Sequence, residues 1–291
     1  MSLPVIIKKG DKLYVNPAKR FIKPYWLTTT PETVALAANA VSGPIPFVID
    51  ESMGHMEIYY LVAQATGPFT FRIKDEGRNY YWSNREVHVD TVIGVAQRPF
   101  ILPETYFLNA SAGTRQLTIE MTDISGAPNN VRIALVGRRF TYKEAPQEVW
   151  QKFEDFYTTK ERSNLFFLTT ELPIAALAPG VANLQNFDFW MTSDCFFEAI
   201  KFTYATVPAG ALLDIRMWEF GSGRSFLPAN TRTDINNMFG SAQFPSIPPE
   251  SYFFDRDYRV SGDIVNTGMV NCNVFLTITG RRVKYPEEVV R

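Results

Sequence analysis

The chain has 291 residues, of which 46% are hydrophobic and 20% charged, and its formal net charge is -1. The 23 Phe, 13 Tyr and 5 Trp provide ample material for a buried core, which excludes intrinsic disorder as the main property of the chain. The near-zero charge argues against bulk nucleic acid as a partner. The 2 Cys are too few for a disulfide framework or a closed zinc site.

Residues 1–22 form a basic arm before the first predicted domain. The cations of the arm and its border are Lys8, Lys9, Lys12, Lys19, Arg20 and Lys23, and Asp11 is the single acid among them. A signal peptide needs roughly 7–15 apolar residues after its basic region, and a membrane helix about 20, and the sequence has neither. We therefore expect synthesis in the cytoplasm and no membrane partner. The arm either contacts the acidic remainder of a neighbouring subunit or is a solvated tail.

Residues 23–145 have the pattern of a β-sandwich domain. The predicted strands include residues 56–66, 69–74, 115–122 and 130–142. Apolar and polar residues alternate cleanly in 115–122 and 130–142, which is the period of a strand with one buried face. The turn signal Gly67-Pro68 separates the first two strands. The turn-rich stretch 77–103 is expected to be an ordered surface loop.

Residues 146–161 predict the one α-helix of the chain. Pro146 suits a first helical turn, and residues 147–160 contain no further Gly or Pro. Trp150, Phe153 and Tyr157 recur at helical spacing and give the helix one aromatic face. The helix either connects two domains as a strut or binds a partner.

Residues 162–286 repeat the first domain, and residues 287–291 form a short tail. A shift of 146 positions aligns 77–107 with 223–253 without a gap and gives 12 identities in 31 positions. The flanks match as well: Leu27-Thr28-Thr29 with Leu168-Thr169-Thr170, and Gly137-Arg138-Arg139 with Gly280-Arg281-Arg282. The predicted strands of the second copy include residues 196–206, 212–218, 259–267 and 273–283. We therefore predict an all-β chain with two tandem β-sandwich (jelly-roll-like) domains from an internal duplication, joined by one α-helix.

No arrangement of residues in the sequence predicts catalysis. The two histidines, His55 and His88, have no histidine counterpart in the other copy, and His88 aligns with Asp234. We expect them in polar surface or turn positions. Metal-ligand spacings, a nucleophile elbow and phosphate-binding glycine motifs are all missing from the sequence. The sequence therefore predicts no enzymatic activity and no cofactor.

Two groups of side chains are candidates for binding. The first is the pair of arginines that closes each copy, where each can bind an acid of its own domain or of a neighbour: Arg138, Arg139, Arg281 and Arg282. With the cations of the arm they form the predicted interface. The second group consists of aromatic residues that would bind carbohydrate if exposed: Tyr80, Tyr81, Trp82 and Trp218.

Each copy has the order Gly-Arg, a Gly after two apolar residues, Pro-x-x-x-Pro-Glu, a strand, Asn-Val, and a last strand ending in Gly-Arg-Arg. This order resembles a β-sandwich (jelly-roll-like) domain of structural proteins in tailed-bacteriophage virions. The resemblance implies a position on the head, at the collar or along the tail, without catalytic residues.

The expected function is therefore that of a homo-oligomeric virion structural protein, made in the host cytoplasm. It would decorate or cement the head, or form part of the collar or tail. The expected partners are other copies of the chain and other virion proteins such as major capsid, portal or tail proteins, and not nucleic acid. The alternative is a virion surface module that binds host carbohydrate.

Overall fold

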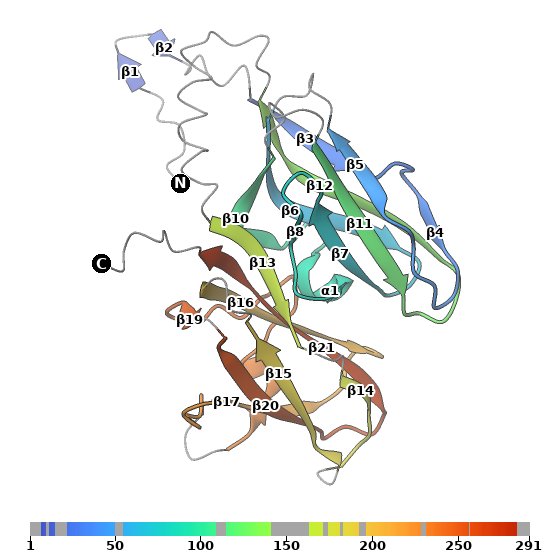
Figure 1. Ribbon diagram of the computed structural model, residues 1–291, viewed down its shortest axis with the longest axis vertical. Helices are drawn as coiled ribbons and strands as arrows, with labels where there is room; N and C mark the ends of the chain where they lie inside the picture. Colours follow the sequence, from blue (N-terminus) through green and yellow to red (C-terminus); the bar gives the residue numbers. More distant parts are fainter. Residues whose placement is uncertain are drawn as a thin grey trace.

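The computed structural model describes residues 22–49, 55–108, 115–140, 163–170, 174–180, 183–191, 196–227, 231–255 and 257–283, and the short strands at 7–9 and 12–14. These residues are mostly β-strand, which confirms the predicted all-β fold. Figure 1 shows two bodies, with the first half of the chain (blue to green) above the second half (yellow to red). The helix predicted at 147–160 lies outside the described residues.

The first half is built from two antiparallel sheets. Its elements are β3 (Ile22–Thr28), β4 (Val34–Leu36), β5 (Ile45–Ile49), β6 (His55–Ala65), β7 (Phe69–Asp75), β8 (Tyr80–Tyr81), β9 (Val87–His88), α1 (Val89–Val92), β10 (Ile101–Leu108), β11 (Arg115–Asp123) and β12 (Asn129–Phe140). One sheet has the order β10-β6-β12-β3, and β4 also pairs with β12. The other has the order β5-β11-β7-β8, and β9 also pairs with β7.

The second half repeats this topology. Its elements are β13 (Ser163–Thr169), β14 (Ile174–Leu177), β15 (Gln185–Trp190), β16 (Phe196–Val207), β17 (Leu213–Glu219), β18 (Thr233–Asp234), the 3-10 helix η7 (Ile235–Asn237), β19 (Tyr252–Phe254), β20 (Arg259–Asn266) and β21 (Cys272–Val283). One sheet has the order β13-β21-β16-β19, with β14 also on β21, and the other has the order β15-β20-β17-β18. The strand orders of the two halves therefore correspond, with β18 in the place of β9, whereas β8 has no counterpart among the described strands of the second half.

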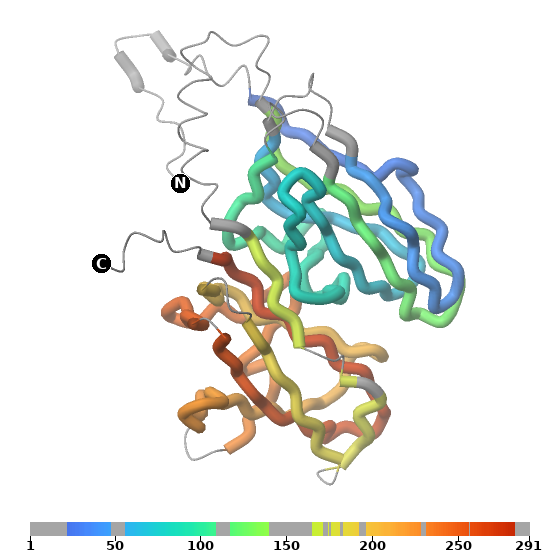
Figure 2. The backbone as a smooth tube through the Cα atoms, in the orientation of Figure 1, coloured from blue at the N-terminus to red at the C-terminus, as the bar shows by residue number. Residues whose placement is uncertain are grey.

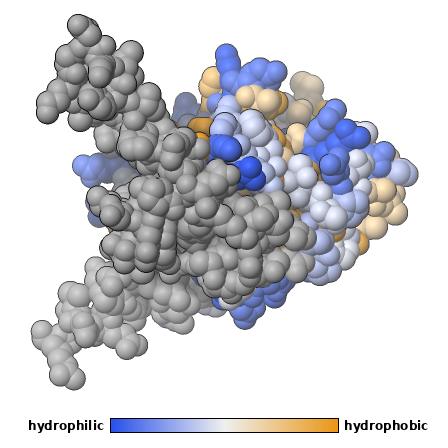
Figure 3. All heavy atoms as spheres, turned by 90° about the horizontal axis from the view of Figure 1, so that it is seen from above, coloured by the Kyte–Doolittle hydropathy of each residue, from blue (hydrophilic) through white to orange (hydrophobic). Residues whose placement is uncertain are grey.

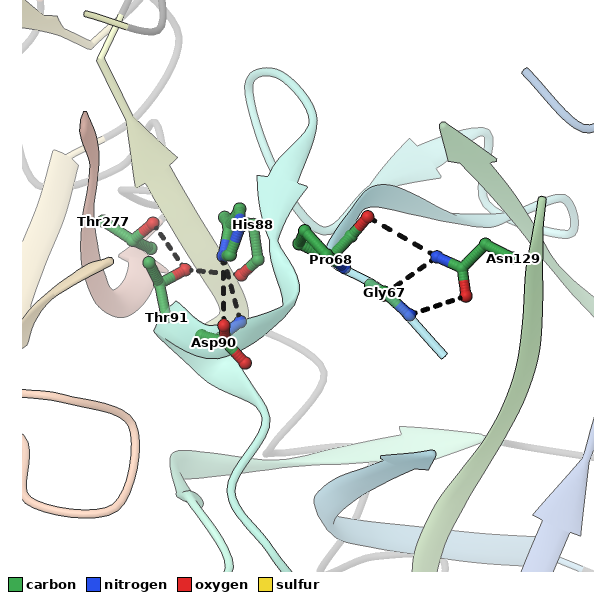
Figure 4. A network of polar contacts seen from close by, with 7 residues as sticks. All are labelled: Gly67, Pro68, His88, Asp90, Thr91, Asn129 and Thr277. Atoms are coloured by element: carbon green, nitrogen blue, oxygen red, sulfur yellow. Dashed lines mark hydrogen bonds and ion pairs between the residues drawn. The ribbon is translucent and has the colours of Figure 1, made fainter. Parts of the chain in front are cut away.

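The strands predicted from alternation agree with the observed ones to within one or two residues at each end, as β11 and β12 illustrate. The cause is visible in β11, where Leu117, Ile119 and Met121 are buried between the sheets. The turn expected at Gly67-Pro68 joins β6 to β7. The side chain of Asn129 holds this turn, because its Nδ2 donates to the carbonyl oxygen of Gly67 at 2.8 Å (Figure 4).

Two glycines of the repeat are required by close contact between backbones. A Cβ at Gly137 would lie 1.9 Å from the carbonyl oxygen of Glu57, and a Cβ at Gly280 would lie 1.9 Å from that of Glu198. Both glycines stand where the pairing of the longest strands shifts its register, β12 on β6 and β21 on β16. The glycine that the two copies share at this position is therefore explained by the lack of space for a side chain.

The hydrophobic clusters of the two halves meet at their boundary. The cluster of the first half includes Leu165, Phe167 and Ala242, which belong to the second half. Conversely, Tyr80 of the first half packs against the cluster of the second. In Figure 2 the segment around residues 80–92 (cyan to teal) lies on the side of the first half that faces the second. The two sandwiches therefore share a packed interface.

Replacing Gly137 by Ala should lower the free energy of unfolding by about 1–3 kcal/mol, because the added Cβ forces two paired strands apart. Gly280→Ala should have a similar effect. Gly43 is the matched control, since a Cβ there would meet no atom within 4 Å. Gly43→Ala should change stability by less than about 0.5 kcal/mol. Urea unfolding followed by circular dichroism measures the difference, and equal stabilities of G137A and G43A would contradict the steric account.

Candidate assembly surfaces

The first half packs onto the second through β10 and through residues 80–91, here called the docking segment, which contains β8, β9 and the start of α1. Its elements lie on the outer face of β13, β21 and β16, here called the receiving face. Residues 77–103 were expected to form a surface loop, and this expectation is wrong for much of the stretch. Trp82, Val92 and Phe100 within it are buried, because they close the core of the first half.

A short edge of the docking segment pairs with β13. The backbone N–H of Phe167 donates to the carbonyl oxygen of Trp82 at 2.7 Å, and a parallel bridge joins Ser83 to Phe167. The side chain of Asn84 continues this pairing. Its Nδ2 donates to the carbonyl oxygen of Thr169 at 2.9 Å, and its Oδ1 accepts from the backbone N–H of Thr169 at 2.8 Å. The two halves are therefore joined by hydrogen bonds in strand-like geometry.

The other end of the docking segment is the short helix α1 (Figure 4). His88 caps this helix, since its Nδ1 accepts from the backbone N–H of Asp90 at 3.2 Å. The His88 ring lies 4.4 Å from the ring of Phe275 on the receiving face, measured between centroids. Thr91 Oγ1 donates to the carbonyl oxygen of His88 at 2.8 Å and accepts from Thr277 Oγ1 at 2.9 Å. The cap of α1 is thus part of the contact between the halves.

Burial lowers the pKa of His88 to about 4, so the imidazole is neutral at neutral pH. The expected turn role of His88 is confirmed by its capping bond, but its expected position at a polar surface is wrong, because it is only 1% exposed. The side chain of His55 lies outside what the structure describes. A neutral, buried imidazole fits the apolar ring of Phe275 beside it.

Further contacts join β16 and the segment before β19 to the first half. Lys201 Nζ donates to the carbonyl oxygen of Ile101 and lies 4.8 Å from the centroid of the Phe100 ring. The guanidinium of Arg98 lies 4.7 Å from the centroid of the Phe244 ring. Arg98 and Phe244 occupy matching positions of the repeat, 146 residues apart. At this point the two copies meet through the same position of the domain.

A cleft of about 400 Å³ lies beside the docking segment, between the halves. Side chains of the first half that line it include Arg72, Arg85, Glu86 and Glu120, and those of the second half include Thr170 and Phe275. Arg72 lies 3.7 Å from the centroid of the Tyr81 ring and donates to the carbonyl oxygen of Asn84 at 3.1 Å. The guanidinium and carboxylate groups of this cleft can hydrogen-bond a polar ligand.

The first arginine of each Gly-Arg-Arg makes an ion pair inside its own half. Arg138 Nε donates to Glu57 Oε2 at 2.8 Å, and Arg281 Nε donates to Glu198 Oε2. Glu57 is fully buried, and Glu198 is nearly so. Of the two alternatives left by the sequence, the structure shows pairing with an acid of the same domain. Each pair satisfies a carboxylate that would be costly to bury alone.

The second arginine of each motif lies over an aromatic ring. The guanidinium of Arg139 is 5.1 Å from the ring centroid of Tyr25, and that of Arg282 is 3.7 Å from the ring centroid of Phe166. Tyr25 and Phe166 are matching positions of the repeat. Arg282 also lies 5.9 Å from the ring centroid of Tyr80 in the docking segment. This arginine therefore contributes to the interface between the halves.

The cations of the arm are only partly described. Lys8, Lys9 and Lys12 belong to a two-stranded antiparallel hairpin, formed by β1 (Ile7–Lys9) and β2 (Lys12–Tyr14). Lys19 and Arg20 lie outside the described residues. Lys23 is exposed on β3. Contact of the arm with a neighbouring subunit stays a prediction.

The aromatic residues proposed for carbohydrate do not form an exposed platform. Trp82 is fully buried, and its ring lies 4.3 Å from that of Tyr106 in the core of the first half. The prediction for Trp82 is wrong, because its backbone pairs with β13 while its side chain fills the first core. Tyr80, Tyr81 and Trp218 are half-buried.

Several residues that join the halves carried only a weak signal in the sequence. Asn84 and Thr169 are identical to Asn230 and Thr28 of the other copy, so the repeat marked them as shared. Sequence reasoning did not connect them, because a shared residue reveals neither its partner nor which copy uses it. Thr277 is not shared between the copies and carried no such signal.

Within the described ranges, no group of three or more His, Cys, Asp or Glu could hold a metal ion. In the same part of the chain, no helix has the length and apolar character needed to cross a membrane.

Comparison with known proteins gives no family. No family model matches the chain, and no curated protein matches it. Among solved structures, the chain is similar to a plant receptor-like kinase, ANX2, and to the ANXUR1 extracellular domain from Arabidopsis thaliana. In each case the TM-score is 0.24 and the identity 10%, over 92% of this chain and 91% of the other. A similarity this weak carries no argument about fold or function.

Acid should destabilise the protein through His88. The folded pKa is about 4, and that of an unfolded chain is about 6.5, so between these values only the unfolded chain binds the proton. The corresponding stability is present above about pH 6.5 and is lost as the pH falls toward 4, by on the order of 3 kcal/mol.

Urea unfolding between about pH 7 and 4.5 measures this loss. His88→Asn keeps a capping side chain but removes the titrating group, so the pH dependence should flatten. His55→Asn is the matched control and should leave the His88 contribution in place. A full pH dependence in H88N would contradict the assignment.

Proposed function

We propose that the chain is a structural protein of a tailed-bacteriophage virion and assembles with copies of itself. The observation that carries the proposal is the packing of one β-sandwich on a second sandwich with the same strand order. A domain that binds its own kind within one chain suits a shell, collar or tail, where many like contacts repeat. The resemblance of the repeated motif to virion domains supports the location.

Several buried carboxylates of the described residues are paired with arginines, as expected for a protein with a structural role. Asp263 is 1% exposed, accepts from Arg232 Nε at 2.7 Å and also accepts from Arg216. Its pair with Arg216 joins β20 to β17. Each of the two buried Glu–Arg pairs described above likewise joins two neighbouring strands within its own sheet. Breaking such a pair by removing one partner leaves a buried charge uncompensated and is strongly destabilising. The proposal assigns these groups to stability and assigns no catalysis.

Exposed apolar side chains supply surface for assembly. Those more than half exposed include Trp26, Phe220, Phe244, Ile247, Phe253, Met269 and Val270. Figure 3 shows the end of the molecule that is uppermost in Figure 1, where small apolar groups lie among hydrophilic residues on the described surface. Apolar groups left in water on a folded protein are typical of interaction sites when they gather into patches.

A second candidate function is the recognition of host carbohydrate, and the cleft between the halves favours it. The cleft combines Arg85 and Glu86, which can bond hydroxyl groups, with the half-buried ring of Phe275. A glycan array with the wild-type chain and with Arg85→Ala tests this candidate. Binding that R85A loses would support it, and an array without binding would remove it.

The purified chain should form oligomers larger than its 33.1 kDa monomer. Sedimentation velocity measures the mass, and negative-stain micrographs show the form of the particles. Immunogold labelling with an antibody against the chain, applied to phage particles purified from cells that make the protein, tests the virion location. A monomer at every concentration contradicts self-assembly, and unlabelled particles contradict the location.

A further inference from the structure

We propose that copies of this chain associate head to tail by using the interface between the two halves a second time, between chains. The inference rests on the proposed self-assembly and names the two surfaces that would carry it. The contact inside the chain is directional, because the docking segment of the first half lies on the receiving face of the second. Among the described residues, one face of each half is therefore left without a docked sandwich. In the first half it is the outer face of β3, β12 and β6, and in the second half it is the region around η7.

The receiving face of the first half is built like that of the second but is open. Trp26 matches Phe167 in the repeat. Phe167 is 1% exposed beneath the docking segment, whereas Trp26 is 58% exposed. Thr28 matches Thr169 and is likewise exposed, while Thr169 is buried against Asn84. The second half thus shows what covers such a face, namely a sandwich of the same kind.

Residues 228–230, which match the paired edge at 82–84, lie outside the described residues. The described end of the region, at η7, begins with a capping side chain as α1 does in the first half. Asp234 caps η7, since its Oδ1 accepts from the backbone N–H of Asn236 at 2.8 Å, as His88 caps α1. Asp234 and Asn236 are exposed. Phe253 on β19 is 59% exposed, whereas its match Phe107 on β10 is 8% exposed. Since β10 packs against β13 and β21, the exposed ring of Phe253 on β19 lies where a further sandwich would be met.

The two open faces carry opposite charges at one pair of positions that are in contact between the halves. In the contact between the halves, His88 lies against Phe275. Their matches in the open faces are Asp234 and Arg132, both exposed. If the second interface repeats the first, the carboxylate of Asp234 in one copy faces the guanidinium of Arg132 in the next. Opposite charges at matching points favour this partner and this register over others.

A second pair of positions keeps its chemistry in the open faces. Inside the chain, the guanidinium of Arg282 lies 5.9 Å from the ring centroid of Tyr80. Their matches are Arg139 and Phe226, again an arginine and an aromatic ring. Docking of the open faces in the same geometry would place Arg139 of one copy near Phe226 of the next. Such a contact is a cation–π interaction like the one that it repeats.

The relation between the halves favours a closed ring. Arg98 and Phe244, which match each other, are in contact. The turns Gly67-Pro68 and Pro208-Ala209, which join matching strands, line one cavity of about 480 Å³. Matching positions lie together when two copies are related by rotation about a nearby axis with little translation along it. Such a rotation closes a ring when its angle is a whole fraction of a full turn, and a head-to-tail interface that does not close gives a filament.

Charge reversal tests the predicted contact of Asp234 with Arg132. Asp234→Arg and Arg132→Asp should each weaken association about tenfold or more, and the double variant should restore it. Asp234→Asn keeps a residue that caps helices well but removes the charge, so it should weaken association while the fold is retained. Sedimentation velocity measures the association constants, and urea unfolding verifies the stability of each variant.

Trp26 gives an independent test. Trp26→Ala should weaken association about tenfold or more, as truncation of a buried interface tryptophan does. Trp190 on β15 is the matched control, because it is 47% exposed but lies on the other sheet of the second half. Trp190→Ala should leave association unchanged. Micrographs of the wild-type oligomer should show rings.

The outcomes separate this inference from the proposed function. Oligomers that W26A and both charge reversals leave intact would overturn the head-to-tail interface while self-assembly stands. Open filaments would overturn the ring. A chain that stays monomeric would overturn both the inference and the proposed self-assembly. Loss in the single reversals with recovery in the double variant would support the contact of Asp234 with Arg132.

Discussion

The arrangement of the whole molecule depends on a few hydrogen bonds at one strand edge. The carbonyl oxygen of Trp82 accepts from the backbone N–H of Phe167, and Asn84 binds both backbone groups of Thr169. These groups lie between two hydrophobic clusters, where an unpaired backbone group would cost as much as a lost hydrogen bond. Because the pairing satisfies them, the Trp82 side chain can enter the core of the first half while its backbone binds the second. The edge thus holds both sandwiches at once.

Most of the fold could be predicted from the sequence, because a sandwich strand with one buried face alternates apolar and polar residues. In β11 this alternation places Leu117 and Ile119 in the core. The shared glycines Gly137 and Gly280 are further local signals, and each allows a close backbone approach. The duplication then extended the predicted strand order of one half to the other.

The interface could not be predicted in the same way, because its burial depends on residues far along the chain. The stretch 77–103 is rich in turn residues, and composition alone indicates a surface loop. Asn84 within this stretch binds Thr169, which lies 85 residues further along the chain. The candidate binding residues show the same limit: the sequence predicts carbohydrate binding by Trp82 if its ring is exposed, but the fold buries the ring in the core. In both cases burial depends on packing between residues far apart in the sequence, which a local sequence pattern does not reveal.

The fusion of two like sandwiches in one chain changes how strong their contacts have to be. Covalent linkage makes the contact of the docking segment with the receiving face intramolecular, so its occupancy depends on an effective concentration and not on the concentration of chains in solution. Under that condition individually weak contacts, such as Thr91 with Thr277 and Arg98 with Phe244, reach a higher occupancy than they would between separate chains. A surface between separate chains has no such advantage and requires stronger contacts to reach the same occupancy. Each chain therefore carries one domain contact already formed, and an assembly of such chains needs half as many encounters as one built from single sandwiches.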